Sequence, residues 1–306
     1  MLAPSTASKY KREYQQYRQF CDLTRQPHNT EHSICLFVTH RADVDKYPAI
    51  AGKVAAINHH LKVNLEQQPM PTLTNLLEGI KRTLAPHQAQ CQRLPIRPPE
   101  LRQIKSVLRK LTTHNSKMLW AATLISYFGC TRISEIASKY TRQYRKNHTL
   151  LVQDVSITNN QLSVFIRAAK TDQYCTGATV IIAENGTDIC PVHATTDYLK
   201  HRANKPGPFF LFDDGTCLTP QRFNTFLHQC LPNTNAGTYS AHSLRIGAAT
   251  VAAEMGYSKE AIQALGRWRS DAYIKYLRFG SNMLLTMSKN LATPSFCLLY
   301  QSDISM

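Results

Sequence analysis

The chain has few carboxylates, no long hydrophobic run and no apolar leader. Aspartate and glutamate total 20 of its 306 residues, against 36 lysines and arginines. This scarcity of clustered carboxylates argues against a nuclease or transposase that depends on metal ions held by acidic side chains. No stretch resembles a transmembrane span, and the first residues lack the apolar run of a signal peptide. We therefore expect an intracellular protein with no membrane partner.

Cysteine and histidine are present, but neither shows the spacing of a metal site. The 9 cysteines include no Cys-x-x-Cys pair, and the 12 histidines include no His-Glu-x-x-His pattern. An odd number of cysteines also argues against a disulfide framework. We expect reduced, mostly buried thiols in a cytosolic or nuclear protein.

The strongest compositional feature is the positive charge, formally +16. Such an excess can simply serve solubility, but one this large more often marks a nucleic-acid partner, because basic side chains displace counterions from phosphates. A membrane surface is a weaker candidate, because the basic residues are scattered and do not form one amphipathic face.

Residues 1–92 show only helical patterns. Tyrosines 10, 14 and 17 and Cys21 recur at helical spacing, and Ser5 or Thr6 is a candidate cap. We predict four short helices. The first carries this stripe, the second and third cover residues 34–40 and 49–61, and the fourth follows Pro71, where Thr72 could be its cap. The outer faces carry basic residues, so this bundle is a candidate DNA-binding domain.

A proline-rich segment, 91–99, separates this bundle from a larger mixed domain at 93–306. There we predict strands at 150–157, 161–168 and 179–183, with a tight turn at 158–160. The predicted helices are 99–111, 118–128, 191–202, 219–231, 242–255, 259–265, 271–278 and 283–291. The fold class is therefore mainly α with a small antiparallel sheet, or α+β.

The most informative stretch combines His242, Arg245, Trp268 and Tyr276. His242 and Arg245 share one face of a helix, because they are three residues apart. Permanently cationic donors, an imidazole and a phenol hydroxyl suit metal-free attack on a phosphodiester. Each residue also has an ordinary interpretation: a buried Arg bound to carbonyls, a core Trp, and a Tyr on a helix face.

Two earlier segments add charged groups to this set. Arg132 stands at a turn before a predicted helix, where Glu135 could orient it or could form an ordinary cap. Lys170 follows a predicted strand, where a turn could project it, although it could equally be a solvated hairpin lysine. The occurrence of all these residues in one order, in one predicted domain, favours a common site.

In that order, Arg132, Lys170, His242-x-x-Arg245, Trp268 and Tyr276 resemble the tyrosine recombinase, or phage integrase, family. The phrases T-R-I-S-E-I, H-S-L-R-I-G-A-A-T and G-R-W-R-S-D-A-Y-I-K-Y-L-R resemble members carried by eukaryotic mobile elements of the Crypton and DIRS kind. The resemblance implies a helical core-binding (SAM-like) bundle followed by a tyrosine-recombinase catalytic domain.

The resemblance also implies a role for each residue. Arg132 and Arg245 would bind the non-bridging oxygens of the scissile phosphate, whose geometry matches the guanidinium fork. Tyr276 would attack the phosphorus to form a 3′-phosphotyrosine, with His242 as general base or hydrogen-bond partner. The other three roles are leaving-group acid for Lys170, phosphate contact or packing for Trp268, and site organisation for Glu135. No metal or nucleotide cofactor is expected.

Two assignments stay open at this point. The interval between Trp268 and Tyr276 is shorter than in many members of the family, which keeps Tyr273 as an alternative nucleophile. The interval between Arg132 and Lys170 is long and contains a basic insert, which makes Lys139 and Lys146 alternative acids.

The function implied is a site-specific DNA recombinase or integrase that acts on double-stranded DNA, in the nucleus if the source is eukaryotic. Dimers on each site and a synaptic tetramer are expected, with the tail at about 280–306 docking on a neighbouring subunit. The alternatives are a catalytically silent DNA-binding protein of the same fold and, less favoured, an enzyme that relaxes DNA as type IB topoisomerases do.

Overall fold

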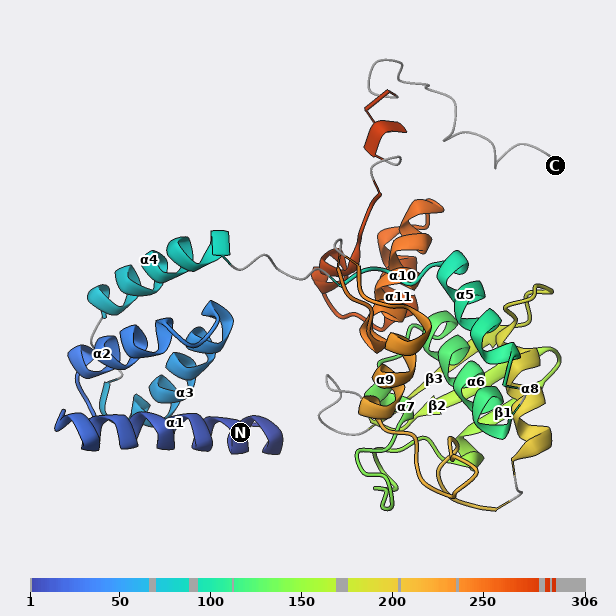
Figure 1. The fold of residues 1–306 in the computed structure, drawn as a ribbon, viewed down its shortest axis with the longest axis horizontal. Helices are drawn as coiled ribbons and strands as arrows, with labels where there is room; N and C mark the ends of the chain where they lie inside the picture. The colour runs from blue at the N-terminus through green and yellow to red at the C-terminus, as the bar shows by residue number, and fades with distance from the viewer. Residues whose placement is uncertain are drawn as a thin grey trace, which may run out of the picture. The chain divides into compact units, whose positions relative to one another are not determined.

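The structure is a computed structural model that describes residues 2–65, 70–87, 93–111, 113–168, 176–202, 205–234, 237–280, 284–286 and 288–289. The chain divides into two compact units, Met1–Gln90 and Cys91–Met306. This division lies immediately before the proline-rich segment 91–99. Figure 1 shows the helical N-terminal unit in blue and cyan and the mixed C-terminal unit in green to red.

The N-terminal unit contains four helices, α1 (Pro4–Thr24), α2 (Glu31–Ala42), α3 (Tyr47–Leu65) and α4 (Pro71–His87). The predicted tyrosine stripe faces inward, since Tyr17 and Cys21 are fully buried and pack with Ile34, Phe37 and Ile57. The predicted caps Ser5 and Thr6 are wrong. Helix α1 begins at Pro4, whose fixed φ suits the first helical position and whose missing N–H costs nothing there.

A charged network lies within this helical unit. Lys53 of α3 is 8% exposed and donates hydrogen bonds to the carboxylate of Glu13 and, at 2.8 Å, to the amide oxygen of Gln16. Asp45 lies 3.8 Å from the same ammonium and also accepts from Arg41. Although burial opposes it, the hydrogen bond from Lys53 keeps the pKa of Glu13 below its usual value. The network ties α1 to α3 by charge as well as by apolar packing.

We predict that Lys53→Met destabilises the N-terminal unit by about 1–3 kcal/mol, because it removes the buried donor to Glu13 and leaves only the exposed Arg12 to pair with that carboxylate. The measurement is urea unfolding of the full chain, with hydrogen exchange resolved for peptides of α1 and α3. Lys11→Met, at an exposed position of α1, is the matched control. Adding Glu13→Gln to Lys53→Met should restore part of the loss. An unchanged unfolding midpoint in Lys53→Met would contradict the argument.

The C-terminal unit begins with α5 (Pro98–Arg109), α6 (His114–Phe128) and the one-turn helix α7 (Ile133–Ile136). As its apolar pattern predicts, α6 is buried on most of its circumference. It packs against α5, α8 (Pro191–His201) and α10 (Ala241–Glu254), so it forms the centre of the core. The remaining helices are α9 (Pro220–Cys230), α10 (Ala241–Glu254), α11 (Lys259–Gly266) and the 3₁₀ helix η2 (Asp271–Tyr276).

Three antiparallel strands, β1 (Val155–Thr158), β2 (Gln161–Ile166) and β3 (Ala178–Ala183), form a small sheet in the order β1-β2-β3. Asn159 and Asn160 both adopt positive φ, as a two-residue hairpin turn requires. The buried side chains of Leu162, Val164 and Ile182 lie on one face, where α8 covers the sheet (Figure 1). The predicted fold class, mainly α with a small antiparallel sheet, is confirmed.

Two predicted elements differ in the structure. The first strand begins at Val155, because the Asp154 carboxylate accepts from Leu151 N–H at 2.8 Å and closes the 3₁₀ turn Val152–Asp154. Residues 271–276 are 3₁₀ and not α-helical. The Thr250 hydroxyl accounts for this, because it donates to Tyr276 C=O and accepts from Arg278 N–H, which draws the chain onto α10.

Within the predicted helix at 283–291, the described stretches 284–286 and 288–289 are helical, and the other residues lie outside the described part of the chain. None of the helices in the described ranges is both long enough and apolar enough to cross a membrane.

Candidate active site

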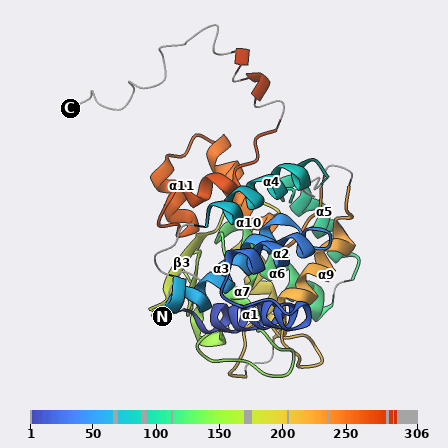
Figure 2. The same ribbon diagram turned by 90° about the vertical axis from the view of Figure 1, so that its left-hand side faces the viewer.

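Helix α10 carries His242 and Arg245 through the core of the C-terminal unit. Its small residues permit a close approach of the segment before α5: a Cβ on Gly247 would lie 1.6 Å from the carbonyl oxygen of Ile96. Ile96 N–H donates to Ser243 C=O at 2.9 Å, which fixes this crossing. Figures 1 and 2 show α10 beside α11, and η2 also packs on α10. These contacts bring the ends of α11 and η2 to the first turns of α10.

Arg245 is fully buried and joins two distant segments. Its guanidinium donates to the backbone carbonyls of Cys130 and Gly266. Its Cζ atom lies 4.2 Å from the centre of the Trp268 ring and 5.6 Å from that of Tyr276. Burial lowers the pKa of Arg245, but a guanidinium stays protonated in proteins. The site therefore holds a permanent positive charge beneath two aromatic rings.

Arg132 is fixed by the acidic residue predicted to orient it. Glu135, which is 3% exposed, accepts from Arg132 N–H at 3.0 Å and from the Arg132 guanidinium at 2.7 Å. The same carboxylate accepts from Arg267 at 2.8 Å. Glu135 thus bridges two arginines from segments more than a hundred residues apart.

Sequence reasoning missed Arg267. This residue follows α11 with φ 54°, in the left-handed region where glycine is usual, and it also donates to Gly129 C=O at 3.1 Å. Gly266 is required beside it, because a Cβ there would lie 1.8 Å from the Trp268 ring. A left-handed arginine after a helix has no spacing signal, and only the tertiary contacts reveal its role.

Tyr276 lies among the other predicted residues, and Tyr273 does not. The ring centre of Tyr276 is 5.0 Å from that of His242 and 5.0 Å from that of Trp268. Tyr273 is 8% exposed and belongs to the apolar core, 6.4 Å from Trp268 on a centre-to-centre measure. The structure thus brings Arg132, His242, Arg245, Trp268, Tyr276 and Glu135 together.

The imidazole of His242 lies in a strongly cationic environment. Burial, together with the positive charges of Arg93, Arg245, Arg132 and Arg278, lowers the pKa of His242 to about 4. The ring is therefore neutral at physiological pH and can accept a proton or a hydrogen bond.

Several buried polar atoms of this region have no hydrogen-bond partner in the structure. They are Thr131 Oγ1, Arg245 Nε, Trp268 Nε1 and Arg278 Nε. Three are obligate donors, and unpaired donors are costly to bury. Their cationic surroundings fit an anionic ligand with several acceptor oxygens, such as a phosphodiester. Among the described residues, no group of three or more His, Cys, Asp or Glu side chains could hold a metal ion.

The described residues do not show which lysine acts as the general acid. Lys170 lies outside the described residues. The alternatives, Lys139 and Lys146, are exposed in the segment that follows α7, and neither donates a hydrogen bond to a site residue within the described part of the chain.

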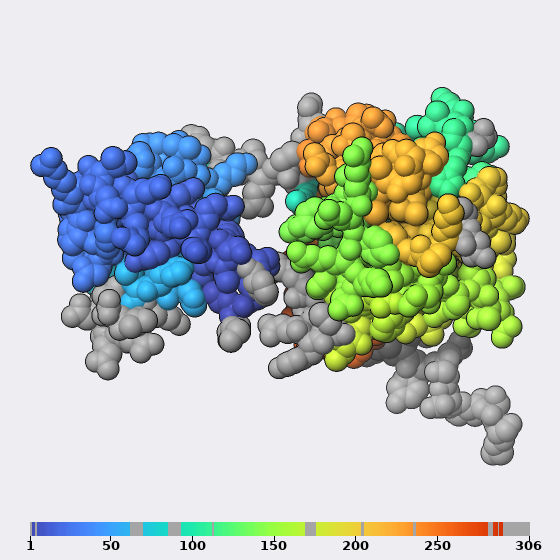
Figure 3. All heavy atoms as spheres, turned by 90° about the horizontal axis from the view of Figure 1, so that it is seen from below, coloured from blue at the N-terminus to red at the C-terminus, as the bar shows by residue number. Residues whose placement is uncertain are grey.

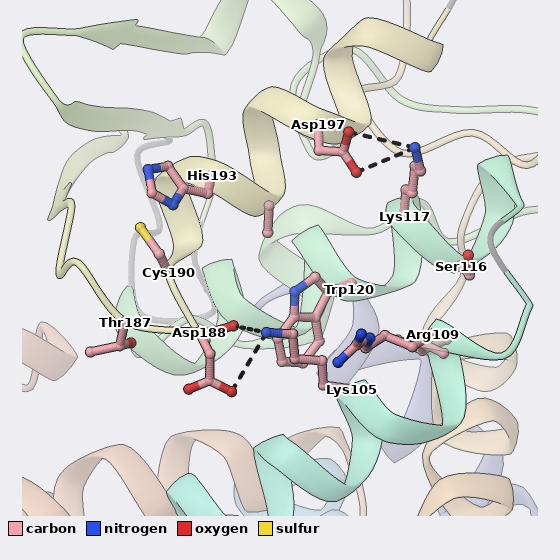
Figure 4. A pocket seen from close by; sticks show the side chains of 12 residues that line it. Lys105, Arg109, Ser116, Lys117, Trp120, Thr187, Asp188, Cys190, His193 and Asp197 are labelled. Atoms are coloured by element: carbon pink, nitrogen blue, oxygen red, sulfur yellow. Dashed lines mark hydrogen bonds and ion pairs between the residues drawn. The ribbon is translucent and has the colours of Figure 1, made fainter.

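A separate cavity of about 620 Å³ lies between α5, α6 and α8 (Figure 4). Its walls carry the ion pairs Lys105–Asp188 and Lys117–Asp197, and Trp120 lies between them. None of the predicted site residues lines this cavity, so the candidate site is the cluster around Arg245.

Comparison with known proteins gives structural matches only. No protein-family model and no curated protein sequence matches this chain. The integrase of the Tn1549 transposon, solved with circular intermediate DNA, superposes with a TM-score of 0.61 at 13% identity over 94% of each chain. XerH site-specific recombinase, solved with a palindromic difH substrate, superposes at 0.60 with 12% identity over 91% of this chain and 76% of its own.

Lambda integrase, solved as a dimer on a COC′ core site, gives a TM-score of 0.54 at 14% identity over 91% of this chain and 73% of its own. The chain has the tyrosine-recombinase fold. At these identities the likeness concerns the fold, and the resemblance to Crypton and DIRS elements stays a prediction.

We predict that the His242 ring stays neutral on acidification until the pH approaches about 4. Arg93→Gln should raise this midpoint, because it removes the largest single charge that opposes protonation. Histidine NMR spectra recorded across the titration measure both, and the resonance missing in His242→Gln identifies the residue. A midpoint for His242 at or above its ordinary value of about 6.5 would contradict the described environment.

Proposed function

We propose that the protein is a site-specific DNA recombinase or integrase that cuts and rejoins DNA through a 3′-phosphotyrosine. One observation carries the proposal. The Tyr276 phenol lies beside a neutral imidazole, above a buried guanidinium, and next to unpaired buried donors. A nucleophile, a proton acceptor and an oxyanion site are the parts that metal-free phosphoryl transfer requires.

In the proposed reaction, Arg132 and Arg245 bind the non-bridging oxygens of the scissile phosphate. Arg245 has no exposed surface, because the rings of Trp268 and Tyr276 cover it. The phosphate therefore reaches Arg245 only after the Tyr276 side chain moves aside. That movement places the phenol oxygen at the phosphorus and gives the unpaired Nε of Arg245 an acceptor.

The bond changes balance without a metal or a nucleotide. Tyr276 Oη bonds to phosphorus, and its proton passes to neutral His242. The bond from phosphorus to the 5′ oxygen breaks, and that oxygen takes a proton from Lys170, with Lys139 or Lys146 as alternatives. Trp268 Nε1, buried and unpaired, donates to a phosphate oxygen. Rejoining reverses these steps, since the phosphotyrosine conserves the energy of the bond.

The proposed partner is double-stranded DNA, bound by a dimer at each site and by a tetramer at synapsis. The tail at about 280–306 docks on the neighbouring subunit. We further propose that the protein serves integration or excision of a Crypton- or DIRS-like mobile element, in the nucleus of a eukaryotic host. The alternatives are a silent DNA-binding protein and a topoisomerase-like relaxing enzyme.

We predict that Tyr276→Phe abolishes covalent attachment to DNA and leaves binding within about a factor of two, because only the attacking oxygen is lost. The measurement is a denaturing gel of protein mixed with nicked suicide duplexes made from the DNA that flanks the gene. Tyr273→Phe is the matched control and should keep attachment.

The reverse pattern, an adduct lost only in Tyr273→Phe, would reassign the nucleophile. Absence of any adduct with the unaltered protein, despite tight binding, would favour the silent DNA-binding alternative. Relaxation of a supercoiled plasmid without strand exchange between two sites would favour the topoisomerase-like alternative.

We predict that Arg267→Met slows adduct formation by about 10- to 100-fold, a usual effect of a small misplacement of a catalytic group. The substitution removes the Arg267 hydrogen bond to Glu135, the carboxylate that in turn binds the Arg132 guanidinium. Arg269→Met removes the same charge at an exposed position two residues away and should leave the rate unchanged. Equal rates for the two variants would exclude a positioning role for Arg267.

A further inference from the structure

The segment between α7 and β1 contains a dense positive patch. The proposed chemistry uses at most one of its cations, Lys139 or Lys146, as the alternative to Lys170. Residues 139–148 form ten consecutive exposed positions without helix or strand. Four of them are Lys139, Arg142, Arg145 and Lys146, and no carboxylate occurs between Glu135 and Asp154. We refer to residues 139–148 as the basic segment.

Among the described residues, none of the four cations of the basic segment forms an ion pair with a carboxylate, and neither do several other exposed cations of the same unit. Lys139 lies 5.3 Å from the ring centre of Tyr140. Asp214 lies in the field of one of the four cations: hydrogen bonds from Thr216, and the weaker positive charges of Arg222 and Arg142, lower the pKa of Asp214.

Backbone contacts hold the basic segment on the C-terminal unit. Ser138 N–H donates to Leu218 C=O at 2.9 Å, and Thr141 C=O accepts from Cys217 N–H at 2.7 Å. The Ser138 hydroxyl donates to Gln143 C=O at 2.9 Å, and at the far end Thr149 and Leu150 are buried. These bonds fix the backbone of the segment on the surface of the C-terminal unit. Figure 3 shows the segment among the green atoms on the face turned to the viewer.

The composition of the basic segment indicates the kind of partner that it binds. Tyr140 and Tyr144 are 42% and 39% exposed, and the ten residues include no aliphatic side chain. A lipid surface would be favoured by aliphatic side chains that insert among acyl chains, and the segment has none. Unpaired cations interleaved with exposed aromatic rings fit a polyanion whose phosphates and sugars both offer contacts.

The position of the basic segment indicates which part of that polyanion it contacts. Lys139 follows Glu135 by four residues, so its Cα lies within about 14 Å of the residue that fixes Arg132. Duplex DNA carries one charge per about 1.7 Å of its axis. A scissile phosphate at Arg132 would therefore place several backbone phosphates within reach of the segment.

We propose that the basic segment is a DNA-backbone clamp that holds the duplex next to the cleavage site. This inference rests on the proposed function for the orientation of the DNA, but it requires no strand cleavage. Its four cations contact phosphates, and the two tyrosines pack on the adjoining backbone.

The first test measures binding of the full chain to a 40-base-pair duplex of mixed sequence at several salt concentrations. Changing Lys139, Arg142, Arg145 and Lys146 together to Gln should weaken binding about tenfold or more. It should also lower the salt slope by about one per lost contact. The matched control changes four exposed cations at the ends of α5 and α8, namely Arg109, Lys110, Lys200 and Lys205, to Gln. The control should change binding by less than about threefold.

The second test places a photoreactive benzophenone side chain in place of Tyr144. Irradiation with the same duplex should crosslink the protein to DNA. Crosslinks to a second protein chain, with none to DNA, would overturn the proposal. An equal weakening of DNA binding by the basic-segment variant and the control variant would also overturn it.

Failure of the clamp and failure of the proposed function give different results. If the fourfold variant of the basic segment binds as tightly as the unaltered protein, and the unaltered protein still forms Tyr276-dependent adducts, only the clamp is wrong. If the fourfold variant loses binding and the photoreactive chain crosslinks to DNA, but the unaltered protein forms no adduct, the clamp stands and the strand-transfer function is wrong. No DNA binding by the unaltered protein would overturn both.

Discussion

The buried guanidinium of Arg245 holds the candidate site together. It binds the carbonyls of Cys130 and Gly266, one just before the Arg132 turn and the other at the end of α11. A charge at zero exposure needs such partners, because an unpaired ion in the interior is very costly. The same bonds draw the turn, α10 and α11 into one cluster. Packing of Trp268 and Tyr276 on the guanidinium then completes the enclosure.

A second charged contact sets the geometry around this centre. The Glu135 carboxylate neutralises one charge between Arg132 and Arg267, so the two guanidinium groups can approach without full repulsion. The site nevertheless keeps an excess of positive charge, which lowers the pKa of His242. Burial and this excess of positive charge keep the His242 imidazole neutral, and donors such as Arg245 Nε are left without an acceptor. The cluster is therefore suited to accept an anion and a proton, in agreement with the proposed strand transfer.

The periodic patterns predicted most of the fold. The tyrosine stripe, the apolar α6 and the Asn-Asn turn each depend on local sequence, and each occurs as expected. The errors lie where a distant or side-chain hydrogen bond changes the local backbone. Asp154 converts the start of a strand into a 3₁₀ turn, and Thr250 draws residues 271–276 out of α-helical geometry. Lys170, which the order of motifs singled out, lies outside the described residues.

The sequence by itself determined the chemical groups of the candidate site and their order along the chain. Spacing also placed His242 and Arg245 on one helical face, because that relation is local. Only the tertiary structure decided which tyrosine meets the imidazole, since Tyr273 and Tyr276 are only three residues apart and their burial depends on packing against Trp268. It also revealed Arg267, whose left-handed backbone and bond to Glu135 arise from contacts between segments more than a hundred residues apart.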